Sequence, residues 1–192
     1  MGGVLKDEFR QLVARCLECD QTAMLELVAR FQGQVFGLCY RMLGQRQDAE
    51  DAAQETFVRV LKNLHQWDSE RDFEPWLLAI AGNRCRTALA KRMKKYNTQP
   101  LVDNVSTGEV DIAHARGLTE EVQLALGRLR DEYREAFVLF HEQEFSYAEI
   151  AEMMSCPVGT VKTWIHRARS EMMQFLRGRG IGQESGHAVR KV

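Results

Sequence analysis

Apolar residues recur at helical spacing along nearly the whole chain, and strand signals are almost absent. Between Met24 and Met42 the apolar positions follow one another at intervals of three and four residues, which is the repeat of one helix face. Similar stripes occupy 53–64, 76–81, 119–140 and 147–172. The pattern fails between Asn97 and Gly117, where turn-forming residues predominate. The sequence therefore predicts an all-α protein of two small helical bundles joined by a flexible linker.

The same pattern sets the expected domain boundaries. We divide the chain into an N-terminal leader (1–20), a first bundle (21–96), a linker (97–117), a second bundle (118–177) and a disordered tail (178–192). The tail is assigned because four glycines fall in it and the helical repeat stops. A chain of 192 residues, of which 45% are apolar, has room for one domain or two small ones.

The start of the chain does not resemble a targeting signal. Lys6, Asp7 and Glu8 interrupt the first residues, so no signal peptide is expected. The longest apolar runs, near 76–82 and 136–140, are far too short to span a bilayer, so we expect no membrane insertion. These features predict a soluble, cytoplasmic protein.

The formal net charge of −1 conceals two segments of opposite charge. Residues 48–76 carry eight acidic side chains against three basic ones, whereas 83–96 carry six basic side chains and no acidic one. Such segregation favours one surface for a polyanion and another for a basic partner. Taken singly, each cluster is as often just a solvated helix face.

No catalytic or metal-binding constellation is evident. Cys16 and Cys19 have the spacing of a redox or zinc motif, but neither a second cysteine pair nor a nearby histidine accompanies them. The odd count of five cysteines fits a reducing compartment better than a disulfide framework. The five histidines pair with no plausible nucleophile or ligand set. We expect no enzymatic activity and no cofactor.

The segment 145–176 is typical of a helix-turn-helix. Ser146 and Glu149 have the spacing of a capping box, and Ser155 to Pro157 break the first helix. The second helix carries long cations and short hydrogen-bonding side chains on the side opposite its apolar seam, which suits contact with phosphates and the major groove. An ordinary pair of packed helices with a solvated charged face is the alternative.

Three segments, in this order, resemble the bacterial sigma factors of RNA polymerase, specifically the small extracytoplasmic-function type. The run from Asp48 to Phe57 is similar to the family's DxxQExF motif, whose acidic and amide face docks on the clamp helices of core polymerase. The resemblance assigns core-polymerase binding to Asp48, Asp51, Gln54 and Glu55. Helical spacing agrees, because it places the last three on one face, opposite Phe57.

The run from Phe73 to Asn83 is similar to the family's FxxWLxxIAxN segment. In the family this helix and the loop before it, here 67–72, open the downstream (minus-10) promoter element and hold an extruded base. The resemblance implies contact with minus-10 DNA by Trp67, Asp68, Arg71, Phe73, Asn83, Arg84, Arg86, Lys91 and Arg92. Many relatives carry Asp or Asn where this chain has Thr87, which leaves the preferred downstream sequence open.

The run from Gly159 to Arg169 is very like the family's GTVKSRxxRAR recognition helix, which reads the upstream (minus-35) element. The residues assigned to minus-35 DNA are Val158, Gly159, Thr160, Lys162, Thr163, His166, Arg167 and Arg169. Trp164 replaces the Arg usual in the family, so the contacts of that position do not carry over.

The resemblance implies a dissociable initiation factor that is a monomer when free. Its expected partners are core RNA polymerase (the clamp helices and the flap), promoter DNA and an anti-sigma factor. Two weak DNA sites on one polymerase would act together, because tethering raises their effective concentration. The main rival is a free-standing helix-turn-helix regulator that binds an operator without polymerase; such proteins usually need a dimer, for which no seam is evident.

Overall fold

Every regular element in the described part of the chain is helical. The structure, a computed structural model, describes residues 2–98 and 118–181. Its elements are α1 (Gly2–Leu17), α2 (Gln21–Leu43), α3 (Arg46–Asn63), the 3-10 turn η1 (Leu64–Gln66), α4 (Phe73–Thr98), α5 (Leu118–Arg128), α6 (Asp131–His141), α7 (Tyr147–Met153) and α8 (Val158–Gly178). Within these ranges, no helix has a stretch long and apolar enough to cross a membrane.

Local sequence chemistry explains where these helices begin and end. The carboxylate of Asp20 accepts hydrogen bonds from the backbone N–H groups of Thr22 and Ala23, at 2.8 and 3.2 Å, and so starts α2. Gly44 ends it in the left-handed region at φ 76°, with its N–H donated to the Tyr40 carbonyl. The predicted end of this helix at Gly44 is confirmed.

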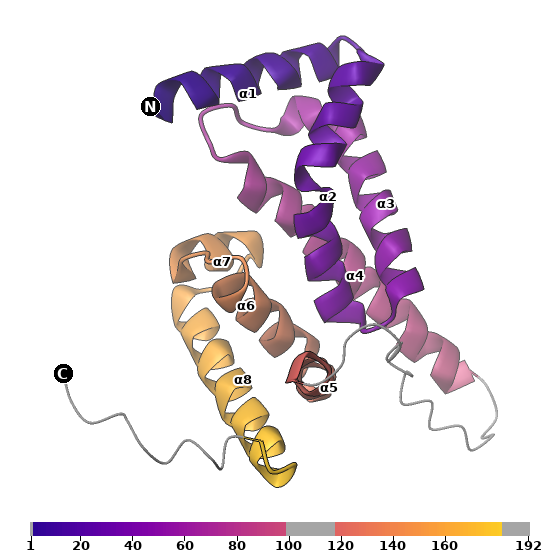
Figure 1. Ribbon diagram of the computed structural model, residues 1–192, viewed down its shortest axis with the longest axis vertical. Coiled ribbons are helices and arrows are strands. Elements are labelled where there is room, and N and C mark those ends of the chain that lie inside the picture. The colour runs from indigo at the N-terminus through magenta and orange to yellow at the C-terminus, as the bar shows by residue number, and fades with distance from the viewer. Residues whose placement is uncertain (1, 99–117, 182–192) are drawn as a thin grey trace.

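The N-terminal bundle consists of α1–α4. In Figure 1, α2, α3 and α4 lie side by side and α1 crosses one end of them. Residues 1–20 were expected to be a leader, yet α1 buries Leu12, Val13 and Cys16 against the bundle. This helix is therefore part of the N-terminal core.

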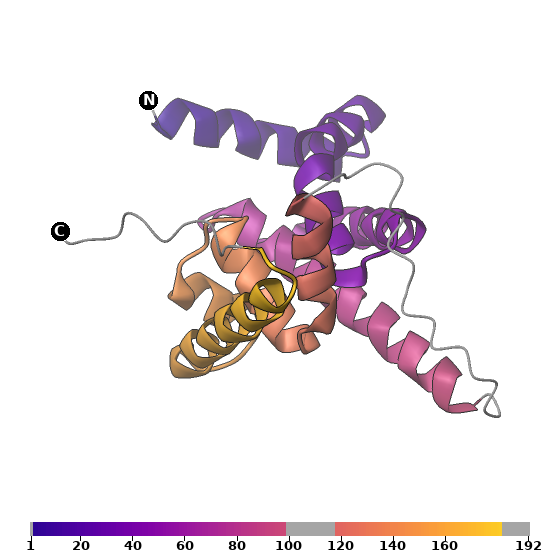
Figure 2. The same cartoon turned by 60° about the horizontal axis from the view of Figure 1, so that its bottom comes forward.

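The C-terminal bundle consists of α5–α8. The apolar seam of α8 is buried as predicted, at Val161, Ile165, Ala168 and Met172. In both views α8 lies on the outer side of this bundle, away from α2 and α4 (Figure 1, Figure 2).

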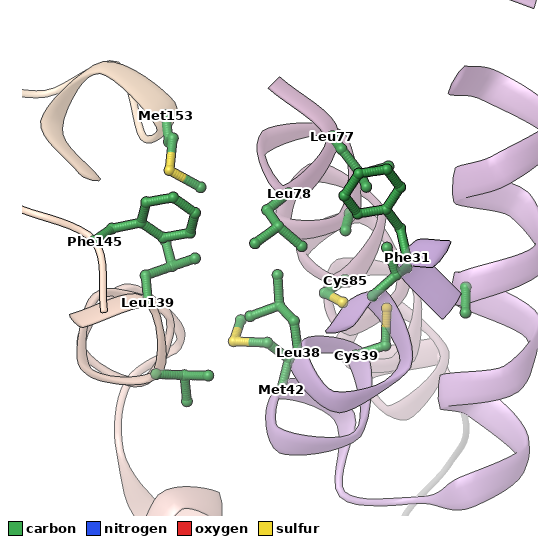
Figure 3. Close-up of a cluster of buried hydrophobic side chains, with 14 of the residues drawn as sticks. Phe31, Leu38, Cys39, Met42, Leu77, Leu78, Cys85, Leu139, Phe145 and Met153 are labelled. Atoms are coloured by element: carbon green, nitrogen blue, oxygen red, sulfur yellow. The ribbon is translucent and has the colours of Figure 1, made fainter. Parts of the chain in front are cut away.

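The two bundles pack against each other and share one hydrophobic core. Leu38, Met42 and Leu78 of the N-terminal bundle face Leu139 and Phe145 of the C-terminal one (Figure 3). The sequence led us to expect two separate bundles on a tether, and only the structure shows this association. The predicted linker lies outside the described residues except for 97–98, at the end of α4, and the predicted tail lies outside them except for 178–181, where Gly178 ends α8 and Arg179 donates to Glu121.

Candidate nucleic-acid interface

An acidic face runs along the exposed side of α3. Asp51, Gln54 and Glu55 are exposed and Asp48 is half-buried, while the opposite side of the helix is buried in the bundle. Glu55 lies 3.6 Å from the Arg84 guanidinium on α4, although its side chain remains 63% exposed. The face can therefore accept hydrogen bonds from basic groups of another protein.

A loop of six residues, 67–72, connects η1 to α4 and rests on a cluster of aromatic rings. The rings of Phe9, Phe31, Trp67 and Phe73 lie with centroids 5.1–5.9 Å apart, mostly edge to face or tilted. Such arrangements stabilise aromatic pairs beyond the area they bury. These rings thus fix the loop to the N-terminal bundle, while residues 68–72 remain exposed.

Helix α1 also holds this loop by hydrogen bonds. The Arg10 guanidinium donates to the Ser69 carbonyl at 3.1 and 3.2 Å and to the Glu70 carboxylate at 3.0 Å. Within the loop, Asp68 accepts from the backbone N–H of Glu70 at 3.0 Å. Sequence reasoning missed Phe9 and Arg10, although the spacing of Phe9, Leu12, Val13 and Cys16 could have indicated the helix.

The predicted loop residues differ in solvent exposure. Asp68 and Arg71 are exposed, and Trp67 is half-buried, with an indole N–H that is buried and has no hydrogen-bond partner. Phe73 is only 4% exposed and lies inside the aromatic cluster. It supports the loop from beneath and does not present its ring to solvent.

The basic residues predicted on α4 are partly neutralised by acidic groups. Arg84 lies beside Glu55 and donates to the Thr87 hydroxyl at 3.2 Å. Arg86 donates to Glu135, on α6, and to the amide oxygen of Asn83. Asn83 and Lys91 are exposed, whereas Arg92 is half-buried. The sequence placed these residues together correctly but did not reveal their acidic neighbours.

The helix-turn-helix has the predicted form. Ser146 accepts from the Glu149 backbone N–H at 3.3 Å, and the Glu149 carboxylate accepts from the Ser146 N–H at 2.8 Å, which confirms the capping box. Ser155 takes a positive φ of 53° in the turn, and Pro157 is the N-cap of α8. Of the predicted contact residues on α8, all are exposed except Thr160, which is half-buried.

Aromatic and polar groups of the same bundle orient the cations of α8. The Lys162 ammonium lies 5.7 Å from the centre of the Tyr147 ring, and Arg167 donates to the Tyr133 hydroxyl at 2.8 Å. Arg169 donates to Nε2 of His141 at 3.0 Å. Partial desolvation and, secondarily, Arg169 hold the pKa of His141 below its usual value, which favours the neutral ring that accepts this bond.

Two acidic side chains of α7 lie beside the 67–72 loop. Glu149 and Glu152 line a cleft together with Trp67, Asp68 and Arg71. The Arg71 guanidinium donates to the Glu152 carboxylate across this cleft. Nothing in the sequence pattern placed these glutamates near the loop, because they lie in the other bundle.

The cysteines of the CxxC pair differ in burial. Cys16 is buried, which raises the pKa of its thiol, and Cys19 is exposed. Among the described residues, no group of three or more His, Cys, Asp or Glu side chains could hold a metal ion.

Comparisons with known proteins match both helical bundles to one family. The family described as Sigma-70 region 2 matches residues 27–95, and the family described as Sigma-70, region 4 matches 119–172. The ECF RNA polymerase sigma factor SigW of Bacillus subtilis is 35% identical over 170 residues, which cover 82% of this chain and 91% of SigW. The ECF RNA polymerase sigma-E factor of Haemophilus influenzae is 31% identical, with 85% and 92% covered.

Two solved structures resemble the fold. The complex of CnrH with the cytosolic domain of CnrY contains a chain that superposes with a TM-score of 0.63 at 27% identity, covering 88% of this chain and 97% of that one. The sigma factor RpoE of Bartonella quintana, solved with the anti-sigma factor NepR, superposes with a TM-score of 0.67 at 20% identity, covering 79% and 95%.

Proposed function

The chain belongs to the extracytoplasmic-function sigma factors of bacterial RNA polymerase, and from this membership we propose how its surfaces divide the work of transcription initiation. As a sigma factor it binds RNA polymerase and directs initiation, while the polymerase carries out RNA synthesis. One observation carries the proposal. The matched regions coincide with an acidic exposed face on α3 and a basic exposed face on α8.

The acidic face of α3 binds core polymerase. Asp51, Gln54 and Glu55 offer carboxylate and amide oxygens to basic side chains on the clamp helices, in a geometry suited to charge-assisted hydrogen bonds. Asp48 is half-buried near the start of the helix, where its negative charge complements the helix dipole. The C-terminal bundle would contact the flap of the polymerase.

The 67–72 loop and the basic side of α4 bind the melted minus-10 element. A strand extruded from the duplex is held by stacking and by positive charge, and the loop offers Trp67 and Arg71 for these contacts. The basic side of α4 would follow the phosphates of the strand once the acidic neighbours of Arg84 and Arg86 are displaced. The residues on this side are Asn83, Arg84, Arg86, Lys91 and Arg92. Phe73 acts only indirectly, by supporting Trp67.

The exposed face of α8 reads the minus-35 element. Lys162, His166 and Arg167 can reach base edges, and Thr163 and Arg169 can reach the edges or the flanking phosphates. Val158, Gly159 and Thr160 lie in the first turn of α8, whose N–H groups suit a phosphate. Trp164 is half-buried and packs against the core, so it takes no part in this readout.

An anti-sigma factor is the proposed regulator. The proposal is supported by the Bartonella quintana structure, in which a protein of the same fold is bound to an anti-sigma factor. We further propose that the free protein is a cytoplasmic monomer, because polymerase and promoter DNA are found in that compartment and one chain carries both DNA-binding surfaces.

Run-off transcription with core RNA polymerase from the same bacterium and a promoter library tests this function. We expect specific transcripts only when the chain and the core enzyme are both present. A gel shift on duplex DNA, with and without core polymerase, tests the alternative of a free-standing helix-turn-helix regulator. Such a regulator would bind its site equally well without polymerase. Transcripts whose start sites do not depend on the chain would refute the proposal.

A further inference from the structure

A cavity of about 500 Å³ lies beside the turn between α2 and α3. Its walls come from α2, α4, α5, α6 and the end of α8, together with Gly44 and Gln45 of the turn. Sites for small molecules have volumes of roughly 300–1,000 Å³ and often lie between the helices of bundles. The cavity is separate from the cleft beside the 67–72 loop, because no residue lines both.

The lining of this cavity is strongly basic. Among the described residues, five arginines contribute to it against one acidic side chain, that of Asp131. Each arginine comes from a different helix or helix end. They are Arg41, Arg92, Arg128, Arg134 and Arg179. A concave surface with charge of one sign concentrates ions of the other sign, so the cavity attracts anions.

Two of the five arginines keep their charge unpaired. Within residues 2–98 and 118–181, Arg92 and Arg128 form no ion pair. Arg92 is half-buried, and the Arg128 guanidinium lies 4.8 Å from the centre of the Phe175 ring. The other three have acidic partners that hold them in place: Arg41 with Glu142, Arg134 with Asp131, and Arg179 with Glu121.

Arg134 is the most buried of these cations, and it lies close to a second one. Carbonyls at the ends of α2 and α5 accept hydrogen bonds from its guanidinium and fix its position. Burial lowers the pKa of Arg134, the charge of Asp131 opposes this effect, and the charge of Arg92 adds to it. An anion bound between Arg92 and Arg134 would relieve the repulsion between them.

The lining suits a small anion with several phosphate groups. A guanidinium can donate two parallel hydrogen bonds to phosphate oxygens, and guanidinium groups that converge from five elements can bind more than one phosphate. Apolar side chains of Leu89, Met93 and Leu124 complete the wall. A single strand of nucleic acid usually needs free rings on which bases stack, whereas Arg128 and Arg179 already cover the ring of Phe175.

We propose that this cavity binds a small oligophosphate, either inorganic or carried on a nucleoside. Arg92 and Arg128 are its principal phosphate ligands, and Arg134 supports them. Of the residues proposed above to contact polymerase or DNA, Arg92 alone lines this cavity. The inference therefore goes beyond the proposed function, and oligophosphate binding requires neither polymerase nor a promoter.

Gly127→Glu tests the site without removing an arginine. Gly127 lines the cavity and an added Cβ meets nothing within 4 Å, so the substitution adds a carboxylate at the wall without a clash. Glutamate is also a better helix former than glycine, so α5 should persist. Gly33→Glu is the matched control, because Gly33 lies within α2, does not line the cavity and has the same open space.

A second pair of variants removes positive charge. Arg92→Gln combined with Arg128→Gln removes the two unpaired cations of the cavity. Arg59→Gln combined with Lys62→Gln removes the same charge from two exposed side chains of α3 that do not line it. Any difference between these double variants therefore reports on the cavity and not on net charge.

Isothermal titration calorimetry of the full-length variants in magnesium-free buffer measures binding of sodium tripolyphosphate, GTP and guanosine. We expect saturable binding of tripolyphosphate and GTP by the wild type and both controls. Binding by Gly127→Glu and by the arginine double variant should be roughly tenfold weaker, at unchanged helicity by circular dichroism. Guanosine, which has no phosphate, should not bind. Tighter binding of GTP than of tripolyphosphate would identify a nucleotide as the ligand, and equal binding an inorganic oligophosphate.

Three outcomes would overturn the inference. The first is absence of binding by the wild type, and the second is equal binding by Gly127→Glu and Gly33→Glu. The third is tighter binding of a short single-stranded DNA than of tripolyphosphate, with the same loss in Gly127→Glu, since the cations would then form a nucleic-acid surface. If the arginine double variant loses helicity, the two glycine variants still decide the matter.

Discussion

Arg134, on α6, donates a hydrogen bond to the carbonyl of Met42 in the last turn of α2, across the junction of the two bundles. Its guanidinium also donates to carbonyls at and just beyond the C-terminal end of α5, those of Leu126, Gly127 and Leu129. The side chain is only 8% exposed. The Arg134 guanidinium thus donates to carbonyls at the ends of α2 and α5, where carbonyl groups lack a donor within their own helix.

Arg134→Met should lower the free energy of unfolding by about 2–4 kcal/mol, because it leaves buried carbonyls without donors. Arg134→Lys should recover only part of the loss, since a single ammonium cannot reach all four carbonyls. Urea denaturation followed by circular dichroism measures both. Arg130→Met is the control, because Arg130 is exposed and should change stability little. Equal effects of the two methionine variants would contradict this role.

The pH dependence of stability should reveal Glu135. Burial raises the pKa of this carboxyl group above its ordinary value of 4.5, and the opposing effect of Arg86 does not cancel the rise. The folded form therefore binds the proton more readily than the unfolded chain, so Glu135 contributes stability below pH 4.5 that is lost as pH rises through the raised pKa.

Glu135→Gln keeps the shape of the side chain and removes this dependence. Its melting temperature should equal or exceed that of the wild type at neutral pH, with a difference that grows as pH rises from about 4.5. Arg86 keeps a hydrogen bond to Asn83 in the variant. Thermal unfolding in a pH series measures the difference; a loss of stability in Glu135→Gln that grows as pH rises would instead mean that the ion pair itself stabilises the fold.

Reversing charge on the α3 face should weaken binding to core polymerase. Asp51→Lys combined with Glu55→Lys should raise the dissociation constant by roughly tenfold or more while helicity is unchanged, because both side chains are exposed. The control is Glu8→Lys on α1 with Glu18→Lys just beyond its end, which makes the same change in net charge. Binding assays at fixed salt compare the two. The docking assignment fails if both double variants lose affinity equally.

Shortening the cations of α8 should weaken binding to the upstream element. Lys162→Ala and Arg167→Ala should each cost about 1–3 kcal/mol where a base edge is read, which anisotropy on minus-35 duplex DNA will measure. Arg167 also donates to the Tyr133 hydroxyl, so the effect of losing this bond must be distinguished from the effect of losing a DNA contact. Tyr133→Phe removes only this bond and should retain DNA binding. If it reproduces the loss, Arg167 acts by bracing the bundle and not by contacting DNA.

Loosening the support of the 67–72 loop should impair promoter opening selectively. Arg10→Ala removes the hydrogen bonds to Ser69 and Glu70 without touching the DNA-binding residues. We expect fewer open complexes, detected by permanganate reactivity of unpaired thymines, at unchanged affinity for minus-35 duplex. Arg128→Ala, which removes an exposed cation from α5, is the control. Unchanged opening by Arg10→Ala would mean that α1 does not position the loop.

Features governed by near neighbours in the chain could be read from the sequence. The end of α2 at Gly44, the capping box of Ser146 and Glu149, and the seam of α8 each depend on residues within one or two turns. The same holds for the exposure of Asp51 and Glu55 opposite the buried Phe57. Helical periodicity also contained the evidence for α1, although the segment was assigned to a leader.

Contacts between residues far apart in the chain could not be read in this way. Arg86 and Glu135 are 49 residues apart, and Arg134 and Met42 are 92 apart. The burial of Phe73 likewise depends on rings from α1 and α2. Each of these contacts requires knowledge of which helix faces meet.

The sequence by itself determined the helices, their caps and the order of the acidic and basic faces, because hydrogen bonds within a helix and the apolar repeat are properties of adjacent turns. Only the tertiary structure decided that α6 packs against α2, and that α7 packs against α4 beside the 67–72 loop. An apolar helix face can be buried against any complementary face. The pairing in this structure also depends on shape at one point, where Gly82 leaves room for the Glu135 carboxylate.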